Sequence, residues 1–262
     1  MDVLVTGASG MLGREVVARL LARGHSVRGV SRKSRSSQQK DFAWIQGDLR
    51  TGAGLDSAME GVGTVVHCAT GFGRHTEEKL AHTITEAAQR TSVSHVVYVS
   101  IVGVDRIPLP YYKQKLRAEE VFRSSGLPVT IVRATQFHDL VRAIFAASAK
   151  SPVMVVPNIR FQPIDAGDVA ARLAFIAASS PAEGEIEIGG PQVESATDLA
   201  HAYVAAAGRK RRIVPFSLPG AIFRGYSEGY HLSPGNALGE VTFAQYLDRH
   251  PDLRRAAYRT TS

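Results

Sequence analysis

The chain has 262 residues, of which 44% are hydrophobic and 21% charged, as in an ordinary globular protein. Its formal net charge is +7, but no helix-turn-helix, zinc-finger or RNA-recognition signature accompanies that charge, so we expect no nucleic-acid partner. The single cysteine excludes a disulfide within the chain. No apolar run reaches the roughly 18–20 residues of a membrane span, and strand-like residues begin at once. We therefore expect no signal peptide, no membrane partner and a cytoplasmic location.

Up to about residue 150, strand-like and helix-like segments alternate. Short apolar runs predict strands at Asp2–Thr6, Ser26–Ser31, Phe42–Gln46, Thr64–Ala69, His95–Ser100 and Val129–Arg133. Apolar residues at helical spacing predict helices at Gly10–Arg23, Leu55–Glu60, Glu77–Arg90, Tyr112–Ser124 and Leu140–Ala149. Such alternation favours a parallel sheet covered on both faces, and right-handed crossovers make it doubly wound. We therefore predict an α/β fold of the Rossmann type.

Residues 151–262 carry a weaker pattern. They contain a predicted hairpin of Val153–Val156 and Arg160–Pro163, a strand at Glu185–Ile188, and helices at Asp165–Ala178 and Thr197–Ala207. After Pro215 the periodicity fades. We expect one compact unit, in which residues 1–150 form a dinucleotide-binding core. Residues 151–262 would complete the sheet and add a small irregular substrate lobe.

A glycine-rich turn joins the first predicted strand to the first predicted helix. Gly7, Gly10 and Gly13 form a G-x-x-G-x-x-G array there. Glycine lets the backbone turn tightly and approach a pyrophosphate, and the helix N-terminus offers that anion unpaired N–H groups. This context predicts a dinucleotide site at the turn, which also contains Ser9, Met11 and Leu12.

The end of the second predicted strand bears on the choice of cofactor. NAD sites commonly have an acidic residue there that binds the ribose 2′-hydroxyl. This chain has Ser31, Arg32 and Lys33 instead, which are a hydroxyl donor and two cations that suit a 2′-phosphate. We therefore favour NADP over NAD as the cofactor, although the two cations could also simply begin the basic segment that runs to Lys40.

Several segments together resemble the short-chain dehydrogenase/reductase superfamily, in its atypical NmrA-like NAD(P)H-binding branch, over roughly residues 1–190. They are GASGMLG (7–13), GDL (47–49), HCAT (67–70), YVSIVGVD (98–105), YYKQK (111–115) and SGLPVTIVRATQFHD (125–139). The resemblance implies that Asp48 and Leu49 lie near the adenine. It also implies that Ala69, Thr70 and Gly71 line the cofactor.

Tyr111 and Lys115 are four residues apart and would share one face of a helix. They match the Y-x-x-x-K motif of classical short-chain reductases, which implies that Tyr111 is the acid and that Lys115 also holds the nicotinamide ribose. A neighbouring ammonium lowers the pKa of a phenol. The resemblance makes Ser100 the carbonyl-polarising hydroxyl. In the alternative interpretation, Lys115 contacts the cofactor beside a structural or pocket-lining tyrosine. Tyr112 is a competing phenol.

The loops after the fourth, fifth and sixth predicted strands should form the walls of the substrate pocket. Phe72, Phe137 and His138 are the candidate substrate residues, because ligands of open α/β sheets bind beyond the carboxyl ends of the strands. His138 could instead belong to a polar pair that caps the next helix. His67, within a predicted strand, is interpreted as a core histidine, and we predict no metal site.

These features predict an NADP-dependent oxidoreductase that transfers a hydride between NADPH and a small hydrophobic or aromatic carbonyl or quinone-type substrate. The alternative is a non-catalytic NADP(H)-binding redox sensor. A small-molecule substrate is the expected partner, and a homodimer stays open.

Overall fold

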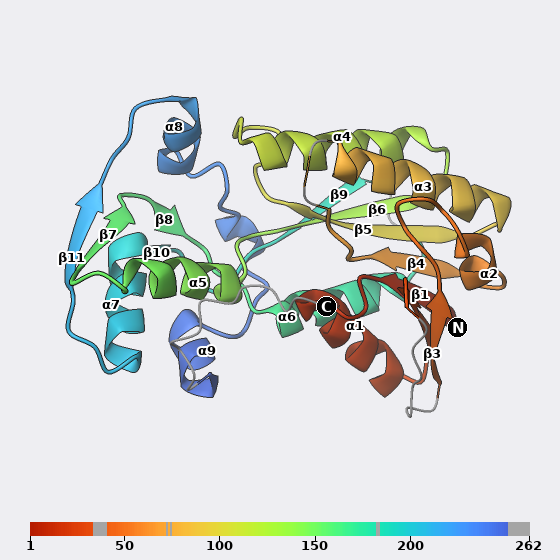
Figure 1. Cartoon of the computed structure of the whole chain (residues 1–262), viewed down its shortest axis with the longest axis horizontal. Coiled ribbons are helices and arrows are strands. Elements are labelled where there is room, and N and C mark those ends of the chain that lie inside the picture. Colours follow the sequence, from red (N-terminus) through yellow and green to blue (C-terminus); the bar gives the residue numbers. More distant parts are fainter. Residues whose placement is uncertain (34–40, 72, 74, 182–183, 251–262) are drawn as a thin grey trace.

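A computed structural model describes residues 1–33, 41–71, 73, 75–181 and 184–250. Its centre is a seven-stranded sheet in the order β3-β2-β1-β4-β5-β6-β9, in which every neighbouring pair is parallel (Figure 1). The strands are β1 (Asp2–Thr6), β2 (Ser26–Ser31), β3 (Phe42–Gln46), β4 (Thr64–His67), β5 (His95–Ile101), β6 (Val129–Ala134) and β9 (Gly184–Ile188). The predicted doubly wound α/β fold is confirmed.

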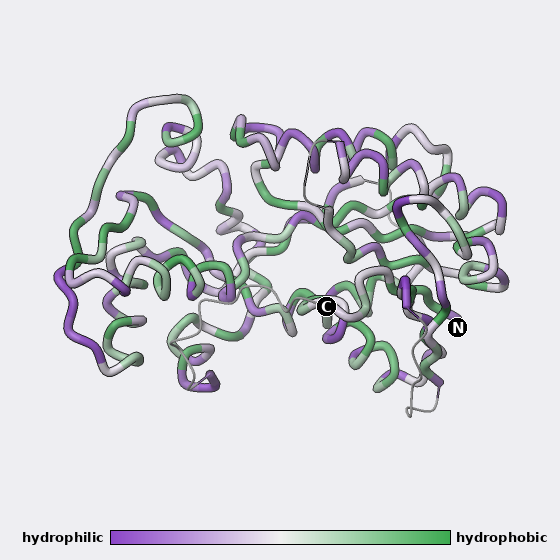
Figure 2. Tube along the Cα trace, viewed as in Figure 1, coloured by the Kyte–Doolittle hydropathy of each residue, from purple (hydrophilic) through white to green (hydrophobic). Residues whose placement is uncertain are grey.

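Helices cover both faces of this sheet (Figure 1). Helices α1 (Met11–Ala22) and α6 (Ala166–Ala177) cover one face, and α2 (Leu55–Met59), α3 (Thr76–Arg90) and α4 (Pro110–Ser124) cover the other. Figure 2 shows mostly hydrophobic residues along α6 and many hydrophilic residues along α3 and α4.

Strand β1 shows how the two faces form separate cores. Val3 and Val5 belong to the hydrophobic cluster beneath α1 and α6, whereas Leu4 belongs to the cluster beneath α3 and α4. Successive strand residues point to opposite faces, so a strand buried on both faces is apolar throughout. Each fully buried side chain of this size contributes roughly 1.5–3 kcal/mol.

A second lobe lies at one end of the sheet (Figure 1). Its core is a third hydrophobic cluster, which includes Phe145, Met154, Tyr203 and Phe243. The elements of the lobe are α5 (His138–Ser148), β7 (Val153–Pro157), β8 (Arg160–Phe161), β10 (Glu194–Ser195), α7 (Ala196–Ala206), β11 (Arg212–Phe216), α8 (Ala221–Ser227) and α9 (Phe243–Arg249). A short 3-10 helix, Pro234–Asn236, lies between α8 and α9.

The hairpin predicted around Pro157–Asn158 is wrong. Strand β7 pairs in parallel with β11, and β8 pairs antiparallel with β10. The chain does reverse direction near these residues, but each strand takes a partner from much later in the sequence. Strand β11 and helices α8 and α9 add regular structure where the sequence predicted an irregular lobe.

Part of the basic segment 208–212 has a structural role. The guanidinium groups of Arg209 and Arg211 donate to the carbonyl oxygen of Ala149, at 3.1 and 2.9 Å. Ala149 is the residue at the C-terminal end of α5, where carbonyl groups lack partners within the helix. In the part of the chain that the structure describes, no helix is long and apolar enough to cross a membrane.

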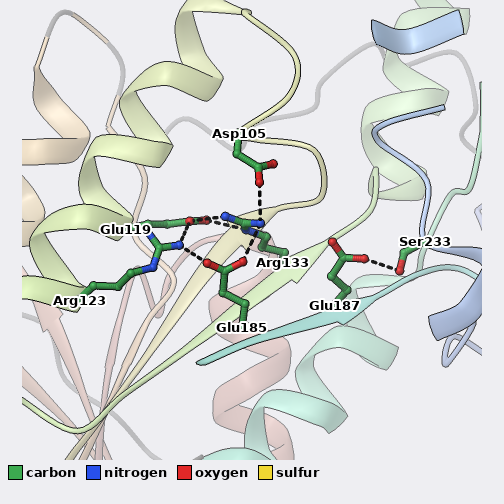
Figure 3. Close-up of polar contacts among 7 residues, drawn as sticks. All are labelled: Asp105, Glu119, Arg123, Arg133, Glu185, Glu187 and Ser233. Carbon is green, nitrogen blue, oxygen red and sulfur yellow. Dashed lines mark hydrogen bonds and ion pairs between the residues drawn. The ribbon is translucent and has the colours of Figure 1, made fainter. Parts of the chain in front are cut away.

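An ion-pair network centred on two buried charges, Arg133 and Glu119, lies at the β6–β9 side of the sheet (Figure 3). Arg133 on β6 binds Glu119 on α4 at 2.7 Å and Glu185 on β9 at 2.7 Å, and it reaches Asp105 at 3.4 Å. Arg123 joins the same two glutamates from α4. Glu119 is fully buried and Arg133 is 5% exposed. Since a buried charge needs a partner, this network helps to specify where α4 and β9 dock.

Replacing Arg133 by methionine should lower the free energy of unfolding by about 3 kcal/mol, because it leaves the buried Glu119 carboxylate with only the partly exposed Arg123. Urea denaturation measures this change. The control is Arg90→Met, which breaks a solvent-exposed pair with Asp56 and should have no measurable effect. A loss in Arg133→Met no larger than the loss in the control would contradict the prediction.

Candidate functional site

The turn between β1 and α1 has space only for glycine at two positions. Gly7 has φ +67°, and a Cβ there would lie 2.7 Å from the backbone nitrogen of Ala69. A Cβ at Gly13 would lie 2.1 Å from the Gly7 carbonyl oxygen. The N–H of Gly10 donates to the same oxygen at 2.8 Å. The turn, the start of α1 and the loop after β4 are therefore packed against one another through their backbones.

Helix α1 begins in a way that suits an anion. Gly10 is its N-cap, no side chain caps its first turn, and that turn contains no acidic residue. The positive end of the helix dipole and the first N–H groups are thus available. Ser9 and Met11 are half-buried beside this turn, whereas the Leu12 side chain packs into the core. These features fit the pyrophosphate of a dinucleotide.

The carboxyl ends of β2 and β3 lie on the same side of the sheet as this turn, because β1, β2 and β3 are neighbouring parallel strands. Ser31 ends β2 and is half-buried, and Arg32 and Lys33 follow it as exposed residues. After β3, the Asp48 carboxylate accepts the N–H of Arg50 at 2.8 Å and so is used to close its own loop. Leu49 packs against the hydrophobic cluster beneath α3 and α4. The end of β2 thus offers cations and no carboxylate.

Buried side chains hold the loop after β4 at two points. The N–H of Ala69 donates to the Thr6 hydroxyl at 3.3 Å, and that hydroxyl is 2.6 Å from Nδ1 of His67. Burial and the nearby Lys115 ammonium lower the pKa of His67 to about 3, so the ring stays neutral. His67 is therefore a core histidine, as the sequence suggested. The second point is Gly71, whose N–H donates to Glu77 at 2.6 Å.

Thr70 lies between these two held positions and is exposed. Phe72, a candidate substrate residue, lies outside the described residues.

Lys115 is bound to a carboxylate inside the protein. Its side chain is 4% exposed, and Nζ donates to Glu77 at 3.1 Å and to the carbonyl oxygen of Val99 at 2.9 Å. The hydroxyl of the fully buried Tyr98 also donates to Glu77, at 3.4 Å. Because Glu77 balances the charge of Lys115, the ammonium is a weaker electrostatic partner for a tyrosine than an unpaired cation would be.

Two tyrosines, Tyr111 and Tyr112, lie at the start of α4. Tyr111 is partly buried against a hydrophobic cluster, and Tyr112 is 6% exposed within that cluster. The pKa of Tyr112 is raised mainly by burial and to a smaller extent by the neighbouring Tyr226. The Tyr112 hydroxyl accepts a hydrogen bond from the Tyr226 hydroxyl at 3.3 Å. Ser100, at the end of β5, has a buried hydroxyl without a hydrogen-bond partner among the described residues.

Two candidate substrate residues follow β6, and they differ in position. Phe137 is partly buried against the cluster beneath α1 and α6. His138 is fully buried, its Nε2 lies 2.9 Å from the carbonyl oxygen of Val241, and its ring packs against the rings of Phe243 and Tyr246. The His138 side chain therefore belongs to the contact between α5 and the segment that includes α9, and its role toward a substrate stays a prediction.

Sequence reasoning did not single out Glu77 or Thr6. A signal for Glu77 was present, because position 77 falls on the apolar stripe of α3 with Leu80, Ala81 and Ile84, all of which are buried. A charged residue on such a stripe needs a buried partner. No group of three potential metal ligands occurs in the described ranges.

A family model for NAD(P)H-binding proteins matches residues 7–171. A curated relative, the (4-alkanoyl-5-oxo-2,5-dihydrofuran-3-yl)methyl phosphate reductase of Streptomyces griseus, is 31% identical over 139 residues, 52% of this chain and 48% of the relative. The photosystem II assembly factor Ycf39 of Trieres chinensis is 27% identical over 150 residues, 53% and 46% of the two chains. An uncharacterized protein of Mycobacterium tuberculosis is 37% identical over 102 residues, 38% of this chain and 12% of the relative. The matched segments thus cover less than half of each of these three relatives.

Two solved structures share the fold along nearly the whole chain. The NADPH-dependent quinone oxidoreductase QOR2 of Escherichia coli, complexed with NADPH, has a TM-score of 0.82 at 20% identity, covering 94% of this chain and 99% of that one. The triphenylmethane reductase of Citrobacter sp. with NADP(H) has a TM-score of 0.77 at 17% identity, covering 95% and 99%. Since the family match covers well over half of the sequence, the chain belongs to the NAD(P)H-binding family.

Proposed function

We propose that this protein is an NADP-dependent oxidoreductase that transfers a hydride between NADPH and a small hydrophobic or aromatic carbonyl or quinone-type substrate. The observation that carries the proposal is the set of groups at the carboxyl ends of the parallel strands, which is called the sheet edge here. It combines the glycine turn, the uncapped start of α1 and the cationic end of β2 with the Lys115 and Ser100 side chains. The reductase among the relatives and the NADPH-dependent quinone oxidoreductase among the structural neighbours support the same class.

Each part of this edge has a role in the proposal. The N–H groups of the turn bind the pyrophosphate, and Arg32 with Lys33 binds the 2′-phosphate. Lys115 has one ammonium N–H beyond those given to Glu77 and Val99, and that donor is directed to the nicotinamide ribose. Bound NADPH supplies the hydride.

The Ser100 hydroxyl donates to the oxygen on which negative charge develops, and Tyr111 supplies the proton.

A second candidate function is a non-catalytic NADP(H) sensor. It is favoured by the pairing of Lys115 with Glu77, which reduces the electrostatic help that the lysine can give to a catalytic tyrosine. It is also in line with the assembly factors among the relatives. A sensor would bind NADPH and transfer no hydride.

Gly7→Ala should weaken NADPH binding at least tenfold, because its Cβ would meet the backbone of Ala69 and displace the turn. The control is Gly24→Ala, which also has positive φ, +76°, but has no atom within 4 Å of the new Cβ. This control should cost about 1 kcal/mol of stability and leave the affinity unchanged. Fluorescence titration with NADPH measures both affinities, and equal affinities would refute the assignment of the turn.

Arg32→Glu should weaken NADPH binding roughly tenfold to hundredfold and leave NADH binding nearly unchanged, because it removes one charge-assisted contact to the 2′-phosphate and adds repulsion. Arg23→Glu makes the same change in net charge at the exposed C-terminal end of α1. Arg23→Glu should change the affinity for NADPH and the affinity for NADH by less than tenfold. If Arg32→Glu weakens NADPH and NADH binding equally, Arg32 does not select the cofactor.

Turnover separates the two candidate functions. The wild-type protein should oxidise NADPH with at least one member of a panel of aromatic carbonyls and quinones. Ser100→Ala and Tyr111→Phe should each lower kcat by at least tenfold while NADPH affinity is maintained. Ser94→Ala, an exposed serine before the start of β5, is the control and should retain full activity. Tight NADPH binding without turnover across the panel would favour the sensor.

A further inference from the structure

Glu77 lies where the expected cofactor loop meets the expected catalytic helix. It belongs to the first turn of α3, is 1% exposed, and uses its two carboxylate oxygens on opposite sides. One oxygen accepts the N–H of Gly71 at 2.6 Å. The other accepts from Nζ of Lys115 at 3.1 Å and from the Tyr98 hydroxyl at 3.4 Å. A single carboxylate therefore connects the loop after β4 to α4.

The Lys115 ammonium is held at a defined position by this arrangement. The carbonyl oxygen of Val99 on β5 accepts a second N–H at 2.9 Å, and Nζ lies 4.5 Å from the ring centroid of Tyr98. Within the described part of the chain, the contacts with Glu77 and Val99 use two of the three ammonium donors. One donor thus remains for a ligand beside the loop that Glu77 also holds.

On the other side of Glu77, the segment 69–71 after β4 is held at two positions. Its N–H groups at Ala69 and Gly71 are bound to Thr6 and Glu77, and a Cβ on Gly71 would lie 2.2 Å from the Thr76 side chain. A loop held at both positions presents a fixed backbone to a ligand. Moving the Glu77 carboxylate would therefore displace both the loop and the lysine.

We infer that Glu77 is a positioning residue that sets the geometry of the nicotinamide end of the cofactor site, by holding the loop after β4 and aiming Lys115. This inference rests on the NADPH binding in the proposed function. It does not depend on whether the bound cofactor is turned over. The adenosine end, at Arg32 and Lys33, follows β2 and is built by other elements than the α3 and α4 helices that Glu77 connects.

The test compares two ligands. NADPH occupies both ends of the site, whereas adenosine 2′,5′-bisphosphate lacks the nicotinamide and its ribose. Glu77→Gln should weaken NADPH binding roughly tenfold to hundredfold, the cost of losing a charge-assisted contact, and should change the affinity for the bisphosphate less than twofold. Glu78→Gln is the matched control: Glu78 is the next residue on α3, pairs with His75 near the surface, and should affect neither ligand.

Coupling between the two residues provides the second measurement. Lys115→Met should also lose NADPH affinity, and the double variant Glu77→Gln/Lys115→Met should lose less than the sum of the two single losses, because the position of the ammonium depends on Glu77. The double variant carries no unpaired buried charge, so it keeps the comparison valid if a single variant does not fold.

Equal losses for NADPH and the bisphosphate, full NADPH affinity in Glu77→Gln, or additive losses in the double variant would each overturn the inference. If the wild-type protein bound the bisphosphate and NADPH equally well, the nicotinamide end would have no built site, which would also overturn it. A wild-type protein that bound neither ligand would instead refute the proposed function, and this inference with it.

Discussion

Helix α1 can lie directly against the first turn only because positions 7 and 13 have no side chain. The Gly7 carbonyl oxygen occupies the space that a Cβ of residue 13 would need, and the Ala69 backbone occupies the space beside residue 7. This contact sets where α1 begins and which way its N–H groups point. It also brings the loops after β1 and β4 together, at the position where the strand order reverses and where ligands of open α/β sheets bind.

Charge pairs complement the hydrophobic contacts on one face of the sheet. Helices α3 and α4 each place a buried glutamate against a neighbouring element: Glu77 contacts Lys115, and Glu119 contacts Arg133. Apolar side chains permit several packing arrangements of similar energy, whereas a buried carboxylate is satisfied in only one. The first pair faces the candidate site and the second faces the β6–β9 side of the sheet, so helix α4 is aligned at two points along its length.

The part of the fold that repeats strand and helix could be predicted because its signals are local. Apolar runs such as Val96–Val99 and glycines at the ends of helices recur at regular spacing. The pairing of β7 with β11 has no such signal, because the two strands are distant in sequence and Pro215 interrupts the apolar run in β11. Pro157–Asn158 is typical of a turn, but a turn does not identify which strands pair.

The candidate site divides in the same way. Gly7, Gly13 and Arg32 could be identified from their place between a strand and a helix or at a strand end. The partners of Lys115 could not be identified from the sequence, because Lys115 on α4 and Glu77 on α3 are separated by 38 positions along the chain. The position of His138 also depends on such a contact. Its ring packs against Phe243 and Tyr246 of α9, a helix whose sequence showed no periodicity strong enough to predict it.

The order of elements along the chain has a consequence for synthesis. Strands β7 and β8 of the lobe precede helix α6 and strand β9 of the sheet, and β11 follows both. A growing chain that has emerged only to residue 150 lacks the helix that covers α1 and lacks the edge strand beside β6. Strand β7 likewise has no partner until β11 is made. Since long-range parallel pairing is slow to form, both lobes remain incomplete on the ribosome until most of the chain is available, and they should then fold together as one cooperative unit.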